Sequence, residues 1–305
     1  MSAMWNKSKS GVPGGARPPA AVEITPEGVL AAALPGKNQD PVYAFAPLRP
    51  GTLLPGIGEP NLREPRAVAD AIRAVLGDVS PRTRAVTLVV PDTSVRVFVL
   101  DFDSLPANAA EAVPVLRFRL RKMVPFDVEH AGVSYQILSQ DKTECRVLAA
   151  VLPGPILAEY ENAVRAAGYE PGVVLPSSLA ALAALETTEP VLAACLSGLS
   201  LTTSITSDQD LLLYRTLDLP EDPAQRLTEV QRDIAVAAAY FEDKLATRSR
   251  RLHYGGIGAA QDFARWIKDP ELTVVELAPR PTTGVTTTMG NISVAGIAGA
   301  LAGAR

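Results

Sequence analysis

The sequence predicts an α/β protein of two domains, and three observations lead to this expectation. Strand-like apolar runs alternate with amphipathic helical segments along most of the chain. The length of 305 residues is enough for two domains. Apolar residues make up 47% of the chain and charged residues 20%, a balance that is typical of globular proteins with a buried core.

Charge, cysteines and histidines exclude several classes of function. A formal net charge of −4 gives no general attraction to nucleic acid. Cys145 and Cys195 lie in separate apolar runs, so we expect reduced core residues and no disulfide. His130 and His253 are the only histidines, and the sequence has no metal-ligand spacing, P-loop or nucleophile motif. No apolar run reaches the roughly 18–20 residues that cross a bilayer, so we expect a cytoplasmic protein.

The first part of the chain predicts a tail, a hairpin and a helix. Residues 1–19 are polar and rich in glycine and proline, which predicts a disordered tail. Apolar runs on both sides of a Pro-Glu-Gly turn at 26–28 are typical of a β-hairpin. Helical spacing of apolar residues over 66–76 predicts a helix, with Gly77 as its C-terminal stop.

The middle of the chain predicts a strand, a basic amphipathic helix and two more strands. Alternation of apolar residues over 95–100 indicates a half-buried strand. Pro125 stops the helix that follows, because the residue before proline is disfavoured in the α conformation. The apolar side of this helix is Val113, Leu116, Leu120 and Met123 or Val124, and its basic side is Arg117, Arg121 and Lys122.

The second half predicts a further series of helices and strands. Pro155 is placed to start a helix that Gly168 ends. A strand then leads to a short helix for which Ser177 or Ser178 is the expected N-cap. The remaining expected elements are three strands over 191–218, a long helix over 223–245, a strand and a helix around Gly255 and Gly256, a strand near 272–279, and a final helix of small residues over 289–303.

Three short sequences in the middle of the chain, VVPDTSVRVFVLDF, KMVPF and SYQIL, resemble in their order the PilM family. Members of that family are cytoplasmic actin-like components of type IV pilus assembly machines, related to FtsA and to the cytoplasmic domain of GspL. The resemblance covers roughly residues 19–305. It implies an actin-like, ribonuclease H-like fold of two domains with a small inserted α+β subdomain. The implied parts are a tail at 1–19, a first domain at 20–190 with the insertion at about 92–152, and a second domain at 191–305.

The resemblance places the first phosphate loop of the actin-like fold at the N-terminal hairpin. Nucleotide-binding relatives have there an aspartate for the metal, a glycine that permits close backbone approach, and commonly a basic residue. This chain has Glu23, Thr25 and Leu30 at the matching positions. Pro26 also removes a backbone N–H of the kind that binds phosphate.

The second phosphate loop is expected in the strands over 191–218. Arg215 matches an arginine of the family, and this alignment puts Cys195 at the position of an aspartate and Ser197 at that of a glycine. A thiol is a poor ligand for hydrated magnesium. Gly255 and Gly256 lie where actin-like proteins turn against the adenosine, although a tight turn would explain these glycines equally.

Three functions are compatible with this sequence. The preferred one is an assembly scaffold without ATP hydrolysis and without a cofactor. The alternative is an ATP-binding protein whose nucleotide state regulates pilus assembly, with ATP and magnesium in a retained pocket. A sugar-kinase or acetate-kinase relative would need an intact phosphate loop and a carboxylate base, and neither is visible in the sequence.

The family's partner gives a last expectation. In the PilM family, the inserted subdomain and the first domain bind the cytoplasmic N-terminal peptide of PilN, an inner-membrane protein. Motor ATPases of the pilus are further possible partners, and the membrane is reached only through the partner. The candidate peptide-binding residues in this chain are Val97, Val99, Arg117, Leu120, Arg121 and Val124.

Overall fold

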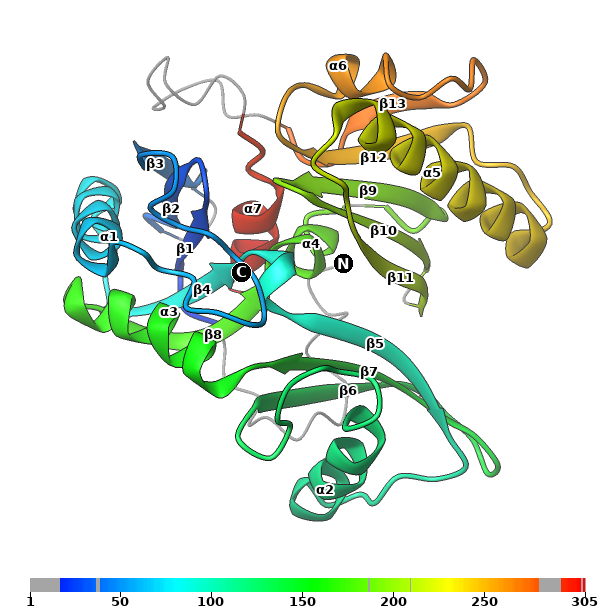
Figure 1. Cartoon of the computed structure of the whole chain (residues 1–305), viewed down its shortest axis with the longest axis horizontal. Coiled ribbons are helices and arrows are strands. Elements are labelled where there is room, and N and C mark those ends of the chain that lie inside the picture. The colour runs from blue at the N-terminus through cyan, green and yellow to red at the C-terminus, as the bar shows by residue number, and fades with distance from the viewer. Residues whose placement is uncertain are drawn as a thin grey trace.

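The computed structural model of the chain describes residues 17–36, 39–185, 187–208, 210–279, 292–302 and 304, and within these it contains three β-sheets (Figure 1). Most of the predicted tail lies outside the described residues. The same holds for residues 289–291 and 303 of the predicted final helix.

The first sheet has five strands in the order β3-β2-β1-β4-β8. Its first three strands form an antiparallel meander that begins with the predicted hairpin, and β4 and β8 extend it in parallel from the other side of β1. Antiparallel strands need only a short turn, whereas the parallel ones are reached through helices. The strands are β1 Ala20–Thr25, β2 Gly28–Ala33, β3 Val42–Pro47, β4 Ala85–Val90 and β8 Glu170–Pro176.

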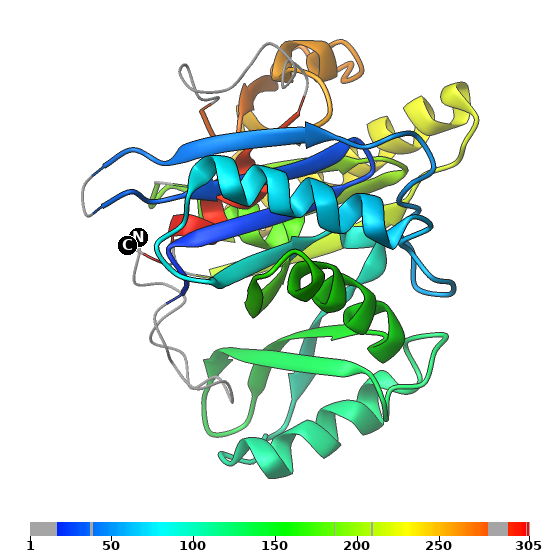
Figure 2. The same ribbon diagram turned by 90° about the vertical axis from the view of Figure 1, so that its left-hand side faces the viewer.

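Helices cover both faces of this sheet, which is why β1 and β2 are apolar and buried almost throughout (Figures 1 and 2). On one face lie α1, Pro65–Val79, and α3, Gly154–Ala166, which share a core with the sheet. On the other lie α4, Ser177–Leu182, and α7, Ala295–Ala302. The last two come very close together: a Cβ atom at Gly299 would lie 1.9 Å from the carbonyl oxygen of Ala180.

The second sheet repeats the strand order of the first, as β11-β10-β9-β12-β13. Again three strands form an antiparallel meander and two follow in parallel. α5 and α6 cover its outer face, and its inner face packs on α4 and α7, so these two helices lie between the sheets (Figure 1). The elements are β9 Val191–Ser197, β10 Ser200–Ser207, β11 Asp210–Asp218, α5 Pro223–Leu245, β12 Arg251–Gly256, α6 Ala260–Ala264 and β13 Thr273–Glu276.

The third sheet is small, antiparallel and ordered β5-β7-β6. A short 3₁₀ helix, Asp92–Ser94, connects β4 to it. One face of the sheet packs against α2, and the far end of this unit lies away from both larger sheets (Figures 1 and 2). The elements are β5 Arg96–Phe102, α2 Ala109–Leu120, β6 Gly132–Gln140 and β7 Cys145–Leu152.

Three local predictions were wrong. α1 continues through Gly77 and ends at Ser80, whose backbone adopts φ 48° and whose N–H bonds to the carbonyl of Leu76. α2 ends at Leu120 with Arg121 as its C-cap, before the stop that was expected at Pro125.

The third concerns the expected cap of α4. Neither Ser177 nor Ser178 caps it: the residue before the helix is Pro176, and no side-chain cap is formed. Both serine hydroxyls point instead to carboxylates of the site described below. The free thiols of Cys145 and Cys195 agree with the prediction that no disulfide joins them.

Candidate functional site

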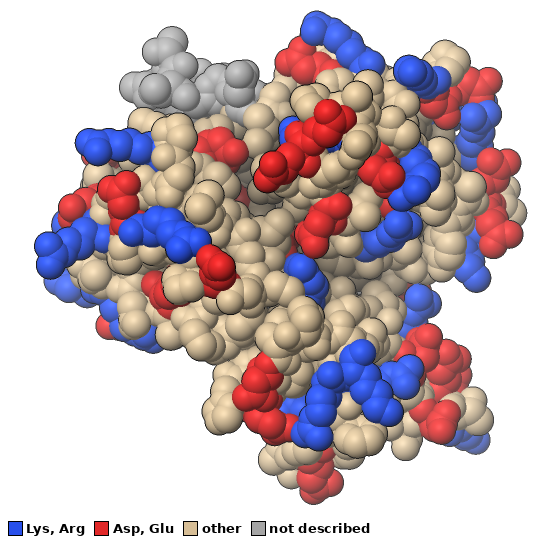
Figure 3. Space-filling model, in the orientation of Figure 1, with Lys and Arg blue, Asp and Glu red and all other residues tan. Residues whose placement is uncertain are grey.

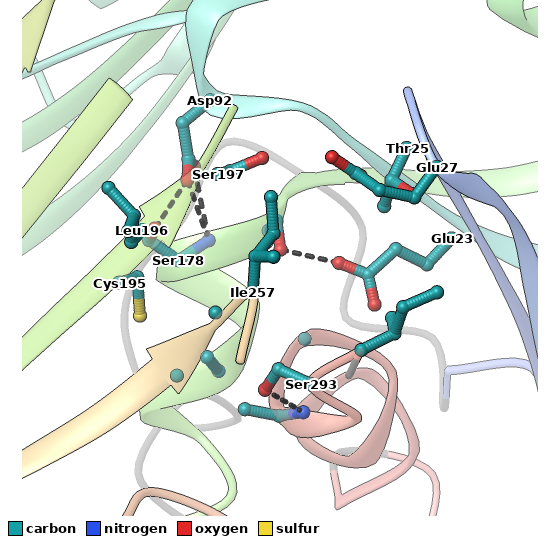
Figure 4. Close-up of a pocket in the computed structure, with 17 residues that line it drawn as sticks. Glu23, Thr25, Glu27, Asp92, Ser178, Cys195, Leu196, Ser197, Ile257 and Ser293 are labelled. Carbon is teal, nitrogen blue, oxygen red and sulfur yellow. Dashed lines mark hydrogen bonds between the residues drawn. The ribbon is translucent and has the colours of Figure 1, made fainter. Parts of the chain in front are cut away.

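A pocket lies between the two large sheets, where several strands and helices end (Figure 4). The β1–β2 hairpin, the 3₁₀ helix, the starts of α4 and α7, and the ends of β9 and β12 all contribute to its wall. All six residues that the sequence suggested for the two phosphate loops and the adenosine turn line it: Glu23, Thr25, Cys195, Ser197, Gly255 and Gly256.

Glu23 is the most unusual of these residues, because its carboxylate is buried with only 4% of the residue exposed. The Ser177 hydroxyl donates a hydrogen bond to one carboxylate oxygen, and the backbone N–H of Ile297 also stabilises the charged form. The other oxygen, Oε2, has no hydrogen-bond partner among the described residues. Burial outweighs these contacts and raises the pKa of Glu23 to about 7.

The start of α7 is shaped around this carboxylate. A Cβ atom at Gly296 would lie 2.6 Å from Glu23 Oε1 and 2.8 Å from Ser177 Oγ. Only glycine therefore allows the helix to come this close. Glu23 occupies the N-terminal end of α7, where the partial positive charge of a helix favours an anion.

Asp92 is a second buried carboxylate in the pocket, and it was not among the predicted site residues. Its oxygens accept hydrogen bonds from the backbone N–H of Ser178, at 3.1 and 3.3 Å, and from the Ser178 hydroxyl. Burial raises the pKa of Asp92 to about 6, against the opposing effect of these hydrogen bonds. Figure 4 shows the Glu23 and Asp92 carboxylates pointing into the pocket from different sides. The Pro-Asp pair that ends the β4 segment was the available signal.

The hydroxyl of Thr25 is engaged within its own turn. It donates to the carbonyl of Gly28 at 3.0 Å and accepts from the N–H of Gly28 at 3.2 Å. These bonds close the β1–β2 hairpin where a phosphate loop would present free donors. The hydroxyl of Thr25 therefore stabilises the turn of the hairpin.

Cys195 and Ser197 lie at the end of β9. Burial is the largest effect on the Cys195 thiol and raises its pKa to about 12, with the nearby Asp92 acting in the same direction. A thiol in this state is protonated at neutral pH, so it is a poor nucleophile, and as a soft ligand it is also poorly suited to magnesium.

Gly255 and Gly256 end β12 and lie beside β9 rather than in a following loop. A Cβ atom at Gly256 would lie 2.4 Å from the carbonyl oxygen of Leu196, and one at Gly255 would lie 3.4 Å from Cys195 Sγ. Close approach of the two strands is thus a sufficient reason for Gly256, whatever the pocket binds.

The pocket is small and acidic. Its volume is about 50 Å³, room for a few water molecules at about 10–15 Å³ each. Two buried carboxylates and the side chain of Glu27 face it, and none of the described residues that line it is lysine, arginine or histidine. A triphosphate would meet negative charge without a side-chain cation. This set of residues is therefore a poor fit for ATP in the arrangement observed.

Arg215, which the family resemblance singled out, lies on β11 outside the pocket lining. Its guanidinium forms an ion pair with Asp233 of α5 at 3.3 Å, and the hydroxyl of Thr203 donates to the same carboxylate at 3.0 Å. Asp233 is buried, so this contact joins the outer helix to the second sheet.

The six candidate peptide-binding residues lie on β5 and around α2, and they differ in accessibility. Val97 and Val99 are half-buried on β5 and pack partly against the core between the sheets. Leu120 and Val124 are buried beneath α2. The side chains of these four residues are thus partly or wholly engaged within the fold.

The two arginines of that set also have partners. Arg117 donates hydrogen bonds to the carbonyl oxygens of Val128 and, at 3.0 Å, Ala131, so it holds the loop after α2. Arg121 is exposed and pairs with Glu129. Sequence alone placed both on a solvent-facing side and could not show these contacts.

Within the described residues no helix is long and apolar enough to cross a membrane. Nor do the described residues contain a group of three or more histidine, cysteine, aspartate or glutamate side chains that could hold a metal ion.

Comparison with known proteins shows the fold. No family model and no curated protein sequence matches the chain. A chain of a structure described as a PilM–PilN type IV pilus biogenesis complex matches with a TM-score of 0.73 at 18% identity, over 95% of this chain and 100% of that one. The cytoplasmic domain of EpsL, an inner-membrane component of the type II secretion system of Vibrio cholerae, matches with a TM-score of 0.50 at 13% identity, over 89% and 91%. The chain has an actin-like fold, as the sequence resemblance implied.

Proposed function

We propose that this chain is a scaffold of a type IV pilus, or related secretion, assembly platform, and that it binds the cytoplasmic N-terminal peptide of a PilN-like inner-membrane protein. The observation that carries the proposal is the match to a chain of a PilM–PilN complex, which extends over 95% of this chain and all of the other. A match over 95% of this chain supports a common architecture that extends to the third sheet, which the resemblance assigns to peptide binding. The EpsL domain, also from an inner-membrane system, has the same fold.

The chemistry of the pocket supports a scaffold that does not hydrolyse ATP. Hydrolysis requires a metal held by hard oxygen ligands, a positioned water and compensation of phosphate charge. Here Cys195 is a protonated thiol, the Thr25 hydroxyl closes a turn, and Glu23 occupies the end of α7. We propose that the cleft has kept its shape as part of the scaffold and has lost its use as a nucleotide site.

We further propose where the peptide lies. Val97 and Val99 are only half-buried, and Arg121 is exposed, so these side chains have surface left for a partner. Leu120 and Val124 would support the site from beneath, and Arg117 would hold the adjoining loop. In this arrangement the protein is cytoplasmic and is held at the inner membrane by its partner, with pilus motor ATPases as further candidates.

Co-purification tests this proposal. The chain is co-expressed with the full-length PilN-like protein of the same cell, and with a version that lacks only the residues before its membrane-spanning segment. We expect co-purification with the full-length protein in detergent and none with the truncated one. Equal recovery of both, or recovery of neither, would contradict the proposal.

Nucleotide binding separates the scaffold from the alternative function. Titration with a fluorescent ATP analogue and magnesium should show no saturable binding in the micromolar range. Saturable, magnesium-dependent binding would instead favour a protein whose nucleotide state regulates assembly.

A further inference from the structure

The outward side of α2 is an apolar surface that the fold leaves uncovered. The inward side, which includes Leu116 and Leu120, is fully buried in the core of the third sheet. On the outward side Phe118 is 67% exposed, the highest value among the exposed large apolar residues of the described chain, and Val115 is 38% exposed. Met123 follows in the turn after the helix and is 41% exposed. The helix therefore has a second apolar side that does not contribute to the core beneath it.

Basic residues surround this surface. α2 and the three residues after it contain Arg117, Arg119, Arg121 and Lys122 against Glu111 alone, a formal charge of +3 in a chain whose net charge is −4. Arg119 and Lys122 are exposed and have no hydrogen-bond or ion-pair partner among the described residues. Figure 3 shows lysine and arginine side chains gathered on the lobe that contains α2, with acidic side chains at the edges of the group.

Two of the nearby acidic side chains are already engaged, whereas Glu111, in the first turn of α2, is exposed. Glu129 pairs with Arg121, and Asp127 pairs with His130 at 2.5 Å. Arg119 and Lys122, together with Phe118, are therefore free to meet a partner, and these two basic side chains outnumber the single acidic side chain of the helix, Glu111. That partner must be anionic and must accept an aromatic ring.

The position of α2 indicates the kind of partner. The helix lies at the end of the molecule, away from α5, β13 and the pocket, and its outward side projects from the surface (Figures 1 and 2). A folded acidic protein would need a shape complementary to a projecting phenylalanine, whereas a lipid bilayer accepts one without such a fit. Basic side chains beside an exposed aromatic residue are the composition of interfacial membrane contacts.

We propose that the outward side of α2, formed by Val115, Phe118, Arg119, Lys122 and Met123, binds directly to an anionic membrane surface. Phe118 enters the boundary between headgroups and acyl chains, and Arg119 and Lys122 contact lipid phosphates. The contact goes beyond the proposed function, because it needs no partner protein. It would orient the third sheet toward the membrane.

Vesicle flotation tests the proposal with the full chain and no other protein. The chain should float with vesicles of phosphatidylglycerol and phosphatidylethanolamine and stay behind with vesicles of phosphatidylcholine alone. Arg119→Glu combined with Lys122→Glu should reduce the bound fraction by about tenfold or more, because each basic side chain near an anionic surface strengthens membrane binding. Phe118→Ser should also reduce it, while thermal unfolding stays unchanged because the side chain is exposed.

The matched control is Arg49→Glu combined with Arg66→Glu, which changes the net charge equally at two other exposed positions. This variant should keep most of the binding. Absence of binding to anionic vesicles, or equal losses in both double variants, would overturn the proposal. If a polyglutamate peptide binds in an α2-dependent manner while vesicles do not, the surface serves an acidic protein and the proposal is wrong. None of these outcomes bears on peptide recognition, which co-purification in detergent measures separately.

Discussion

Replacing Glu23 with glutamine should remove a large part of the dependence of stability on pH. The Glu23 carboxyl is buried, and its pKa is raised from 4.5 to about 7 in the folded chain. Because the folded state holds the proton more tightly than the unfolded state, the stabilising contribution is fully present below about pH 4.5. It is lost as pH rises through about 7.

The magnitude follows from the shift. A pKa that is raised from 4.5 to about 7 corresponds to about 3 kcal/mol over the whole range, at about 1.4 kcal/mol per unit. Of this, about 2–3 kcal/mol falls between about pH 5 and about pH 8. The raised pKa of Asp92 adds a smaller loss of the same sign in this range. Glutamine is neutral at every pH and of the same size, so Glu23→Gln removes the first contribution and leaves the second.

Urea unfolding followed by circular dichroism at several pH values measures this effect. The original chain should lose about 2–3 kcal/mol more of its free energy of unfolding between about pH 5 and about pH 8 than Glu23→Gln does. Glu27→Gln, in the turn of the same hairpin and also at the pocket, is the matched control and should keep most of the original pH dependence, because Glu27 is the smallest of the causes that raise the pKa of Glu23. An unchanged dependence in Glu23→Gln would refute the assignment of a buried, proton-binding carboxyl.

Two further predictions concern glycines in β12 and α1 and the ion pair between Arg215 and Asp233. Gly256→Ala places a Cβ atom 2.4 Å from the carbonyl oxygen of Leu196 and should lower the free energy of unfolding by about 2 kcal/mol. Gly77→Ala, whose Cβ atom would lie in open space within α1, should raise the free energy of unfolding by about 0.5–1 kcal/mol. Similar changes in the stability of the two variants would contradict the close approach of β12 and β9. Arg215→Ala should cost about 1 kcal/mol in thermal unfolding, because it leaves the buried Asp233 without its cation; Arg215 is 45% exposed, which limits the loss. An unchanged unfolding temperature in Arg215→Ala would mean that this ion pair does not contribute to stability.

Local patterns in the sequence predicted most of the elements. The β1–β2 hairpin and α5 follow from turn residues and helical spacing, which act over a few residues. The six proposed pocket residues come from segments up to about 230 residues apart, and only the family resemblance could place them together.

The rest of the pocket depends on strand pairing that sequence patterns do not determine. β4 and β8 pair in parallel, with Val90 opposite Pro176, and this brings Asp92 beside Ser178. Serine at the start of a helix is typical of an N-cap, so sequence reasoning assigned it that role. The actual partner lies 86 positions away in the chain.

The outward side of α2 shows a similar limit. Helical spacing identified Leu116 and Leu120 as core residues, and both are buried. It also placed Arg117 and Lys122 on the same basic side, although Arg117 is held by backbone carbonyls and Lys122 is exposed and makes no such contact. Only the loop that folds back over the helix distinguishes them.

The most direct test of the account is a calorimetric titration of the purified chain with the cytoplasmic N-terminal peptide of the PilN-like protein, carried out with and without magnesium and ATP. A scaffold that has lost its nucleotide site should bind the peptide with one-to-one stoichiometry and the same Kd in both conditions. Binding that appears only when nucleotide is present, or no binding in either condition, would contradict the account.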